Sequence, residues 1–180
     1  MNRSQTEYFN QAMLPHLDAA YNLACWLTGN ADEAQDLTQE SFLKAFRHFH
    51  AFRGENSRAW LLAIVRNVCY DWLQNRTFLS KIIPENPDGE WDAPCNHYNP
   101  ELATLRADDK LIINRALAAL PFEFREAIVL RELEDCTYNE ISVITGAPLG
   151  TVMSRLARGR EQLRRLLTED FKEECRNAVR

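Results

Sequence analysis

Apolar residues recur at steps of three and four along most of the chain, which is the spacing of one buried face of an α-helix. One such stripe spans residues 9–27, where Pro15 is expected to kink the helix and Gly29 to end it. Two more stripes cover residues 31–49 and 58–76. No stretch of the sequence alternates convincingly between apolar and polar residues, as a half-buried strand would. The N-terminal part is therefore predicted to be a bundle of helices.

The helical pattern is lost between residues 77 and 100, in an acidic segment punctuated by proline and glycine. It returns over residues 102–120, and Pro121 is expected to open a further helix. A segment of this composition between two periodic regions is typical of a linker. The sequence predicts an all-α fold with two small helical domains, residues 1–76 and 105–180, joined by a flexible linker at 77–104.

The stretch from Thr137 to Arg165 reads as two helices across a tight corner. Thr137 and Glu140 match a capping box, in which a hydroxyl and a carboxylate satisfy free N–H groups at a helix start. Gly146 suits the left-handed conformation that ends a helix, and Pro148 suits the first turn of the next one. These signals, in this order, predict a helix-turn-helix.

The second of these helices has one apolar face and one hydrogen-bonding face. Val152, Leu156 and Leu163 are expected to turn inward, whereas Thr151, Ser154, Arg155 and Arg158 turn outward. Donors and cations on one helix face suit base edges and phosphates in a DNA major groove. The alternative interpretation is an ordinary solvated surface, and this stretch alone does not decide between the two.

The distribution of charge along the chain helps to decide between DNA binding and an ordinary solvated surface. The 180 residues carry a net charge of −5, which by itself argues against nucleic-acid binding. The cations are nevertheless gathered in two islands, because residues 46–76 have a net charge of +3 and residues 149–165 one of +4. Local basic islands, rather than total charge, mark surfaces that bind phosphate. The second island coincides with the predicted helix-turn-helix, which favours DNA binding.

An acidic cluster lies on the predicted helix 31–49, opposite its apolar stripe. Acidic residues in a first turn favour the helix dipole, so part of the cluster requires no partner. The other interpretation is a docking face for a basic or helical surface of another protein. The polar face comprises Asp32, Glu33, Asp36, Gln39 and Glu40, and the apolar stripe comprises Leu37, Phe42 or Ser41, Ala45 and Phe49.

Aromatic residues are interleaved with the first basic island. They are Phe46, Phe49, Phe52, Trp60, Tyr70 and Trp72. Cationic grooves with aromatic platforms bind single-stranded nucleic acid, because exposed bases stack on the rings. The competing interpretation is that most of these rings belong to the core, and the helical spacing of Trp60 and Trp72 favours the core for those two.

Cysteine usage and motif content narrow the class further. Five cysteines without a Cys-x-x-Cys pair indicate reduced thiols in a cytosolic protein. Cys95 and His97 lie two residues apart, but no second ligand pair accompanies them, so no metal or other cofactor is predicted. The longest apolar run, residues 59–65, is too short to span a bilayer. The cysteine usage therefore predicts a cytoplasmic protein. The sequence shows no catalytic triad or phosphate loop, so the chain is not predicted to be an enzyme.

Three long segments occur in order: NADEAQDLTQESFLKAF, then FRGENSRAWLLAIVRNVCYDWLQNR, then LPFEFREAIVLRELEDCTYNEI running on to GAPLGTVMSRLARGREQL. Together they resemble the two conserved domains of sigma-70-type RNA polymerase initiation factors. The compact layout is similar to the extracytoplasmic-function (ECF) group. The resemblance covers about residues 9–76 and 105–166. It implies a region 2 helical bundle followed by a region 4 helix-turn-helix.

The resemblance also implies partners. Such proteins bind core RNA polymerase, direct it to the −10 and −35 promoter elements and assist promoter melting, without catalysis of their own. The implied partners are the β′ clamp helices and the β flap of the polymerase, promoter DNA, and an anti-sigma factor that is often membrane-anchored. The acidic helix matches the segment that docks on the clamp helices, and the residues carried over are Asp32, Glu33, Asp36, Leu37, Gln39, Glu40 and Phe42.

Two further sets of residues carry over to DNA. The loop 52–57 and the following helix match the part that reads the −10 element, with Arg53, Asn56, Arg66, Asn67 and Arg76 as candidates. The helix after Pro148 matches the reader of the −35 element, with Thr151, Ser154, Arg155 and Arg158 at bases and Arg160 and Arg164 at phosphates. Ser142, Met153 and Gly159 depart mildly from the commonest family residues, and no base contact is predicted for Met153.

A different class of protein also accommodates part of this pattern. A two-module DNA-binding regulator that does not use polymerase would explain the C-terminal half equally well. It would leave the acidic helix and the aromatic, basic loop unexplained. The promoter sequence, the inducing signal and the identity of an anti-sigma factor are not encoded in any pattern that the sequence displays.

Overall fold

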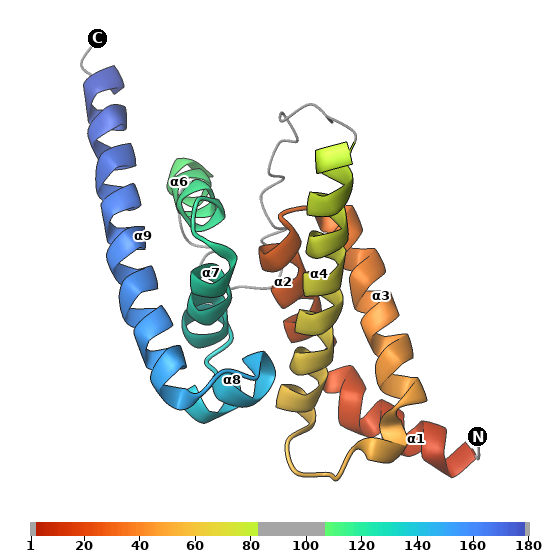
Figure 1. Ribbon diagram of the computed structural model, residues 1–180. Helices are drawn as coiled ribbons and strands as arrows, with labels where there is room; N and C mark the ends of the chain where they lie inside the picture. The colour runs from red at the N-terminus through yellow and green to blue at the C-terminus, as the bar shows by residue number, and fades with distance from the viewer. Residues whose placement is uncertain (1–2, 83–106, 179–180) are drawn as a thin grey trace.

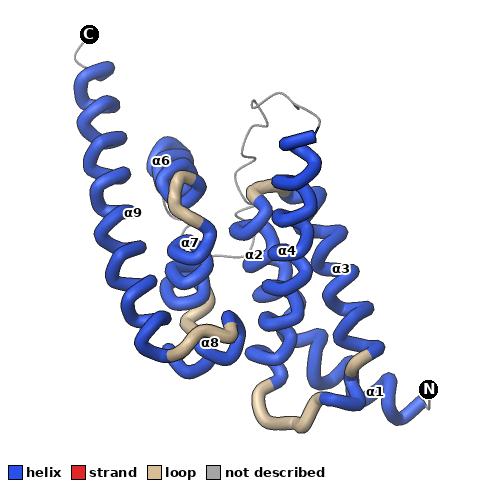
Figure 2. Tube along the Cα trace, in the orientation of Figure 1, coloured by secondary structure: helices blue, strands red, loops and turns tan. Residues whose placement is uncertain are grey.

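The computed structural model describes residues 3–82 and 107–178, and its side chains are described for residues 5–76 and 112–168. All regular structure within these ranges is helical, which confirms the predicted all-α fold (Figures 1 and 2). Most of the predicted linker, with Cys95 and His97, lies outside the described residues.

The N-terminal half is built on three mutually packed helices, α2 (Leu17–Thr28), α3 (Ala31–Arg47) and α4 (Ser57–Ile82). α1 (Arg3–Met13) precedes them and is joined to α2 by a 3₁₀ turn, η1 (Leu14–His16). Pro15 stands in this turn, so the predicted kink is confirmed as a break between two helices. Proline has no N–H to donate to the preceding turn, which is why the helix does not run through it.

Side-chain and glycine caps fix where these helices begin and end. Gly29 closes α2 in the left-handed conformation, with φ 71°. Asn30 caps α3 by accepting a hydrogen bond at Oδ1 from the Glu33 N–H, at 2.9 Å. Asn56 caps α4 in the same way, accepting from the Ala59 N–H at 2.9 Å. Asn56, rather than Ser57, is therefore the cap of α4.

Two predicted boundaries shift. α3 ends at Arg47, and the 3₁₀ turn η2 (Phe49–Ala51) replaces the predicted last turn of that helix. α4 continues to Ile82, so the helix runs past residue 76, where the sequence pattern placed the start of the linker. The apolar periodicity weakens at residue 76, although the backbone stays helical to Ile82. The end of an apolar pattern therefore does not mark the end of the helix.

The C-terminal half consists of α6 (Ala107–Ala118), α7 (Phe122–Ile128), the π-helical turn η4 (Val129–Leu133), α8 (Tyr138–Thr145) and α9 (Leu149–Ala178). α9 packs against α6, α7 and α8. Gly159 permits a close approach of α9 to α7, since a Cβ there would lie 3.2 Å from Cγ1 of Ile128 and 3.3 Å from Cβ of Phe124. A larger residue at this position would therefore push α9 away from α7.

The two halves pack directly on each other. α8 lies against α4, and α7 and η4 lie against α2 (Figure 1). One buried apolar cluster runs through both halves, from Leu27 and Leu62 to Leu130 and Ile141. Trp60 and Trp72 pack against this cluster, as the sequence pattern favoured. None of the described helices is long and apolar enough to cross a membrane.

Candidate nucleic-acid interface

The helix-turn-helix forms as the sequence predicts. Oγ1 of Thr137 accepts a hydrogen bond from the Glu140 N–H at 3.2 Å, and Oε2 of Glu140 accepts one from the Thr137 N–H at 2.7 Å. This reciprocal capping box begins α8. Gly146 ends the helix in the left-handed conformation, with φ 68°. The chain therefore turns sharply and enters α9 at Leu149.

A hydrogen bond that the sequence pattern did not reveal fastens the corner. The Ser142 hydroxyl donates to the carbonyl oxygen of Ala147 at 2.7 Å, so it ties α8 to the turn. Beneath the corner Ile141, Ile144 and Val152 are buried, each at most 2% exposed. Ser142 thus helps to hold the angle between α8 and α9.

The candidate recognition face lies on the first turns of α9. Ser154 and Arg158 are exposed and Thr151 is half-buried, as a groove-facing set requires. The Arg155 side chain is only 26% exposed, and its Nη1 lies 4.0 Å from Oε2 of Glu126. Arg155 is thus partly withdrawn towards a carboxylate of α7, and Ser154 and Arg158 are the two members of the set that are fully exposed.

Two apolar side chains are exposed beside that face. Met153 is 47% exposed and Leu149 is 38% exposed. They lie four residues apart on the start of α9, and with Arg131, Tyr138 and Asn139 they line an open hollow of about 420 Å³. The first turns of α9 therefore present both polar and apolar groups to solvent.

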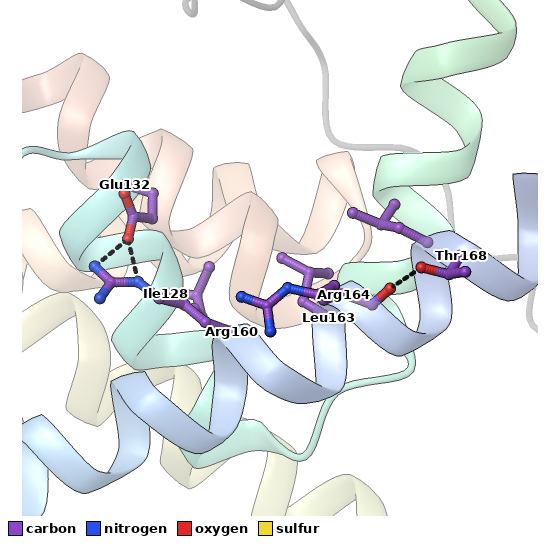
Figure 3. A pocket seen from close by; sticks show the side chains of 7 residues that line it. Ile128, Glu132, Arg160, Leu163, Arg164 and Thr168 are labelled. Atoms are coloured by element: carbon purple, nitrogen blue, oxygen red, sulfur yellow. Dashed lines mark hydrogen bonds and ion pairs between the residues drawn. The ribbon is translucent and has the colours of Figure 1, made fainter.

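Arg160 and Arg164 lie further along α9, and both form ion pairs within the C-terminal half. Arg160 donates from Nε and Nη2 to Oε1 of Glu132 at 2.9 and 2.6 Å, and this bonding raises the pKa of the Arg160 guanidinium (Figure 3). Arg164 pairs with Glu161 at 2.5 Å. Between α7 and α9 the two arginines edge an apolar groove of about 510 Å³, lined also by Ile128, Leu163, Leu167 and Thr168 (Figure 3).

The candidate −10 residues are spread over the loop before α4 and one length of that helix. Arg53, Asn67 and Arg76 are exposed. The guanidinium of Arg76 lies over the Trp72 ring, 5.3 Å from its centroid. Asn56 and Arg66 are different, because both are bonded to carboxylates of the C-terminal half.

Asn56 has two roles. Its Oδ1 caps α4, while its Nδ2 donates to Oε1 of Glu140 on α8 at 2.8 Å. The hydrogen bonds from Thr137 and Asn56 lower the pKa of Glu140, so this carboxylate is ionised at neutral pH. A residue that sequence reasoning assigned to DNA therefore touches the other half of the same chain.

Arg66 is held by a fully buried carboxylate. Its Nε donates to Oε1 of Glu126 at 2.6 Å, and the Glu126 side chain is 0% exposed. The guanidinium also lies over the rings of Tyr70 and Phe122, 4.8 and 5.9 Å from their centroids. Burial raises the pKa of Glu126, and the hydrogen bond and charge of Arg66 oppose that rise.

A third pair joins Arg58 to Glu134. Nη2 of Arg58 donates to Oε2 of Glu134 at 2.7 Å, and Nη1 lies 3.5 Å from Sγ of Cys136. Glu134 is buried, and this burial raises its pKa to about 7 against the opposing charge of Arg58. Neither Glu126 nor Glu134 was singled out from the sequence, since a lone glutamate in an amphipathic helix carries no sign of its partner.

The acidic face of α3 forms largely as predicted. Asp32, Asp36, Gln39 and Glu40 are exposed, and Glu33 is half-buried. Glu40 pairs with Lys44 at 2.8 Å, one turn along the helix. α3 itself lies at the outer edge of the bundle (Figure 1).

The two apolar residues assigned to that face behave differently. Leu37 is 6% exposed and belongs to the core, so its side chain cannot itself contact a partner. Phe42 is half-buried, with its ring edge-on to Phe9 at 6.5 Å between centroids. Leu43, which the pattern did not select, is 57% exposed beside the acidic residues. The apolar part of this face is therefore Leu43 rather than Leu37.

The loop before α4 borders a hollow that both halves line. It measures about 390 Å³, with Phe52, Arg53 and Trp60 on one side and Asn139 and Val143 of α8 on the other. Phe52 stacks on the buried Phe49, with 5.6 Å between ring centroids. Some of the aromatic residues are thus in the core, and others line a surface hollow.

Cysteine and histidine residues form no metal site within the described ranges. Cys25, Cys69 and Cys136 are buried and form no disulfide among the described residues. Burial raises the pKa of the Cys69 thiol to about 12, which keeps it protonated. No group of three or more His, Cys, Asp or Glu side chains in the described part of the chain is arranged to hold a metal ion.

A helix-turn-helix and a separate helical bundle with a polar, cationic face define an all-α protein of the helix-turn-helix DNA-binding class. Residues 13–78 match the family model "Sigma-70 region 2", and residues 110–163 match the model "Sigma-70, region 4". The ECF RNA polymerase sigma-E factor of Escherichia coli (strain K12) is 36% identical over 138 residues, which are 73% of this chain and 72% of that one. The chain belongs to the sigma-70 family, in its ECF group, and is a transcription initiation factor.

Other relatives agree with that placement. The ECF RNA polymerase sigma factor SigE of Mycolicibacterium smegmatis is 36% identical over 175 residues, and the match spans 94% of this chain but 65% of the length of that relative. The sigma factor RpoE, solved in complex with the anti-sigma factor NepR from Bartonella quintana, is 29% identical with a TM-score of 0.73, covering 90% of this chain and 98% of that one. CnrH, solved with the cytosolic domain of CnrY, shares the fold at a TM-score of 0.65, over 92% of this chain and 90% of that one, with 21% identity.

Proposed function

We propose that this sigma factor binds core RNA polymerase through α3, reads the −35 element through α9 and engages the opened −10 strand through α4 and the loop before it. The observation that carries the proposal is the separation of three surfaces by chemistry. An exposed carboxylate face, a polar and aromatic loop region, and a helix-turn-helix with outward donors lie on different elements of one chain.

The polymerase-binding surface is assigned to Asp32, Asp36, Gln39, Glu40 and Leu43. Exposed carboxylates around one exposed leucine suit a partner that is basic with an apolar spot, such as the helical coiled coil of the clamp. Charges at the rim of such an interface set specificity and association rate. Leu43, which the partner would cover, supplies the apolar contact. Leu37 acts from beneath, by packing α3 onto the bundle.

The −35 surface is assigned to Thr151, Ser154, Arg155 and Arg158, with phosphate contacts from Arg160 and Arg164. A helix in the major groove reads bases through side chains on its first turns, and arginine is the residue that reads guanine with two hydrogen bonds. The apolar groove between α7 and α9 is our candidate site for the β flap, because it offers apolar side chains bordered by these arginines.

The −10 surface is assigned to Arg53, Asn56, Arg66, Asn67 and Arg76. Melting exposes bases, and unstacking them costs a few kcal/mol that the protein must offset by capturing the freed strand. A hollow lined by Phe52, Arg53 and Trp60 offers an aromatic wall and a cation for that purpose. The chain itself performs no catalysis in this account.

An anti-sigma factor is the further partner we propose. The structure of RpoE that this chain resembles was solved with the anti-sigma factor NepR. The fold similarity extends over nine-tenths of the chain, so a partner of the same kind can meet the same arrangement of helices. Polymerase, DNA and such a partner would all be met in the cytoplasm.

Selection of promoters from a random DNA pool by reconstituted holoenzyme tests this assignment. The proposal expects the recovered sequences to contain two short conserved elements at a fixed spacing, and expects no enrichment by core enzyme alone. Recovery of a single element would show that only the helix-turn-helix reads DNA. In that case the chain would be a DNA-binding protein without the proposed −10 role.

A further inference from the structure

Two large apolar side chains, Leu149 and Met153, are exposed at the start of α9. No other large apolar side chain among the described residues of this helix is exposed. The two lie four positions apart, so they are neighbours on one side of the helix. They form an apolar spot on the element that carries the candidate −35 residues.

The apolar spot flanks the outward face of α9. Successive residues turn by about 100° around a helix axis, so Met153 and Arg155 lie on opposite sides of the exposed Ser154. Arg155 is drawn towards Glu126 of α7, with 4.0 Å between its Nη1 and Oε2 of the carboxylate. One flank of the face is therefore cationic and partly withdrawn, whereas the other flank is apolar and open to solvent.

Met153 and Leu149 form one wall of the open hollow of about 420 Å³ at the start of the helix-turn-helix. Tyr138 and Asn139, at the start of α8, also line it. Arg131 completes the polar wall, and its guanidinium lies over the Tyr138 ring, 5.4 Å from the centroid. A docked helix-turn-helix places the start of its second helix at base edges, while its first helix crosses the DNA backbone. The hollow therefore lies between the element expected at the backbone and the element expected at the bases.

The backbone beside the apolar spot carries no side chain. Gly150 is exposed, and a Cβ at this position would meet no packed neighbour within 4 Å, so packing inside the chain does not require a glycine there. Without a side chain, the first turn of α9 can come closer to an approaching surface. Such an approach would bring the long Met153 side chain within reach of the base edges.

The chemistry of methionine selects one group in a major groove. A thioether donates no hydrogen bond and accepts one only weakly. Every base pair offers hydrogen-bonding groups in the groove, and thymine adds an apolar group, its C5-methyl. Contact between Met153 and that methyl group removes apolar surface of both from water, whereas contact with a polar base edge would displace water without replacing its hydrogen bonds. An exposed methionine in the groove therefore favours thymine.

We propose that Met153, backed by Leu149, is a specificity-determining residue that contacts the C5-methyl group of a thymine in the −35 duplex. The proposal rests on the proposed role of α9 in −35 binding, and it adds an apolar base contact to a set of polar residues. The sequence pattern predicted no base contact for Met153, because it did not reveal that Met153 and Leu149 line one hollow. It follows that at least one position of the −35 element is a thymine on one of the two strands.

Replacement of thymine by deoxyuridine removes the methyl group and nothing else, so it measures this contact directly. Holoenzyme reconstituted from core polymerase and the full chain first selects its −35 element from a random DNA pool. Each thymine of the recovered element is then replaced by deoxyuridine in turn, and binding is measured by competition. One position is expected to lose about fourfold in affinity, as one methyl group is no longer buried. A recovered element with no thymine on either strand, or with no methyl-sensitive position, would overturn the proposal.

Met153→Gln tests whether the methionine is the source of that sensitivity. Glutamine has a similar length and suits a helix, but it offers an amide in place of the thioether. Holoenzyme with this variant is expected to bind the thymine and deoxyuridine duplexes equally. Leu17→Gln is the matched control, because Leu17 is exposed on α2, and it should keep the difference of about fourfold. Persistence of that difference in a Met153→Gln chain shown to be folded by circular dichroism would overturn the proposal.

The methyl group can also be restored on a different base. At the sensitive position, 5-methylcytosine places a methyl group at the same point of the groove as thymine does. The unmodified chain is expected to bind the 5-methylcytosine duplex about fourfold more tightly than the cytosine duplex, and Met153→Gln to bind the two equally. Equal binding of both duplexes by the unmodified chain would overturn the proposal.

The selection step separates this inference from the proposed function. A recovered −35 element without a methyl-sensitive position would leave the proposed function intact and overturn the inference. Recovery of no −35 element at all would overturn the proposed −35 role, and the inference with it.

Discussion

Arg58 on α4 donates to Oε2 of Glu134 at 2.7 Å, and this pair joins the helical bundle to the segment that leads into the helix-turn-helix. The carboxylate is 6% exposed. The charge of Arg58 and a hydrogen bond with Asn22 lower the pKa of Glu134, whereas burial and the charge of Asp135 raise it. The interface between the halves therefore contains a carboxyl group that titrates near neutral pH.

Stability should depend on pH through this group. Burial raises the pKa of Glu134 to about 7 in the folded chain, above its ordinary value near 4.5. The folded state thus holds a proton that the unfolded state has lost, so the free energy of unfolding is highest below the unfolded pKa and falls as pH rises through 7. We expect a fall on the order of 2 kcal/mol between about pH 5 and pH 8.

Urea denaturation across that range, with Glu134→Gln as the comparison, measures the effect. The variant has no carboxyl group at this position and carries a neutral isostere of the protonated form, so its free energy of unfolding should not show this fall. The difference between the two proteins should therefore be smallest near pH 5 and grow in favour of the variant as pH rises. A constant difference at all pH values would contradict the assignment of this titration to Glu134.

The corner of the helix-turn-helix should depend on Ser142. Ser142→Ala removes the hydroxyl that donates to the Ala147 carbonyl, and we expect a loss of about 1 kcal/mol in the free energy of unfolding. Thr168→Ala is the control, because its hydroxyl also bonds a backbone carbonyl but on the exposed side of α9, and little loss is expected. Equal losses would mean that the corner bond has no special weight.

Alanine substitution of Arg155 and of Arg158 should differ in its effect on stability, although both should weaken −35 discrimination. Arg158→Ala removes an exposed donor, so −35 discrimination should fall by about 1–3 kcal/mol with stability unchanged. Arg155→Ala should reduce discrimination and also destabilise the chain, because Glu126 would lose a nearby cation. Competition binding with mutated −35 duplexes, alongside thermal unfolding, tests both parts. Unchanged base preference for both variants would remove them from the recognition set.

The docking face of α3 can be tested by charge reversal. Asp36→Lys should weaken binding to core polymerase, because Asp36 is exposed within the acidic cluster. Asp18→Lys makes the same change in charge at an exposed position of α2, outside the acidic cluster. This variant should bind core polymerase nearly as well as the unmodified chain. Fluorescence titration of labelled core enzyme compares them. Equal weakening would point to net charge rather than to this face.

Substitution of Asn56, which caps α4, and of Asn67 within α4 should reduce promoter opening. Asn56→Ser keeps a side-chain cap for the helix but removes the amide, and Asn67→Ala removes an exposed amide. Both should reduce strand opening more than closed-complex binding. Permanganate reactivity of unpaired thymines, compared with gel-shift affinity for the closed complex, measures the two steps. Parallel losses in both would place these residues outside strand capture.

Local signals in the sequence predicted much of the fold. The capping box at Thr137, the glycines that end α2 and α8, and the break at Pro15 each act within a few residues. Such interactions are encoded where they occur, so a pattern of neighbours reveals them. The family resemblance then placed the two helical domains and their candidate surfaces on the chain.

Contacts between distant residues could not be predicted in the same way. Glu126 and Arg66 are 60 positions apart, and nothing in either neighbourhood specifies the other. The partial burial of Arg155 depends on how α9 packs against α7, and the amphipathic pattern of one helix does not specify that packing. The π-helical turn η4 and the corner bond of Ser142 likewise depend on tertiary packing rather than on propensity.

Run-off transcription with purified core polymerase tests the central claim most directly. On a linear template carrying a promoter selected by the holoenzyme, the chain should produce one transcript of defined length, and core enzyme alone should produce none. Failure of the folded chain to bind core enzyme or to start a transcript, while it still shifts the same duplex in a gel, would contradict the account.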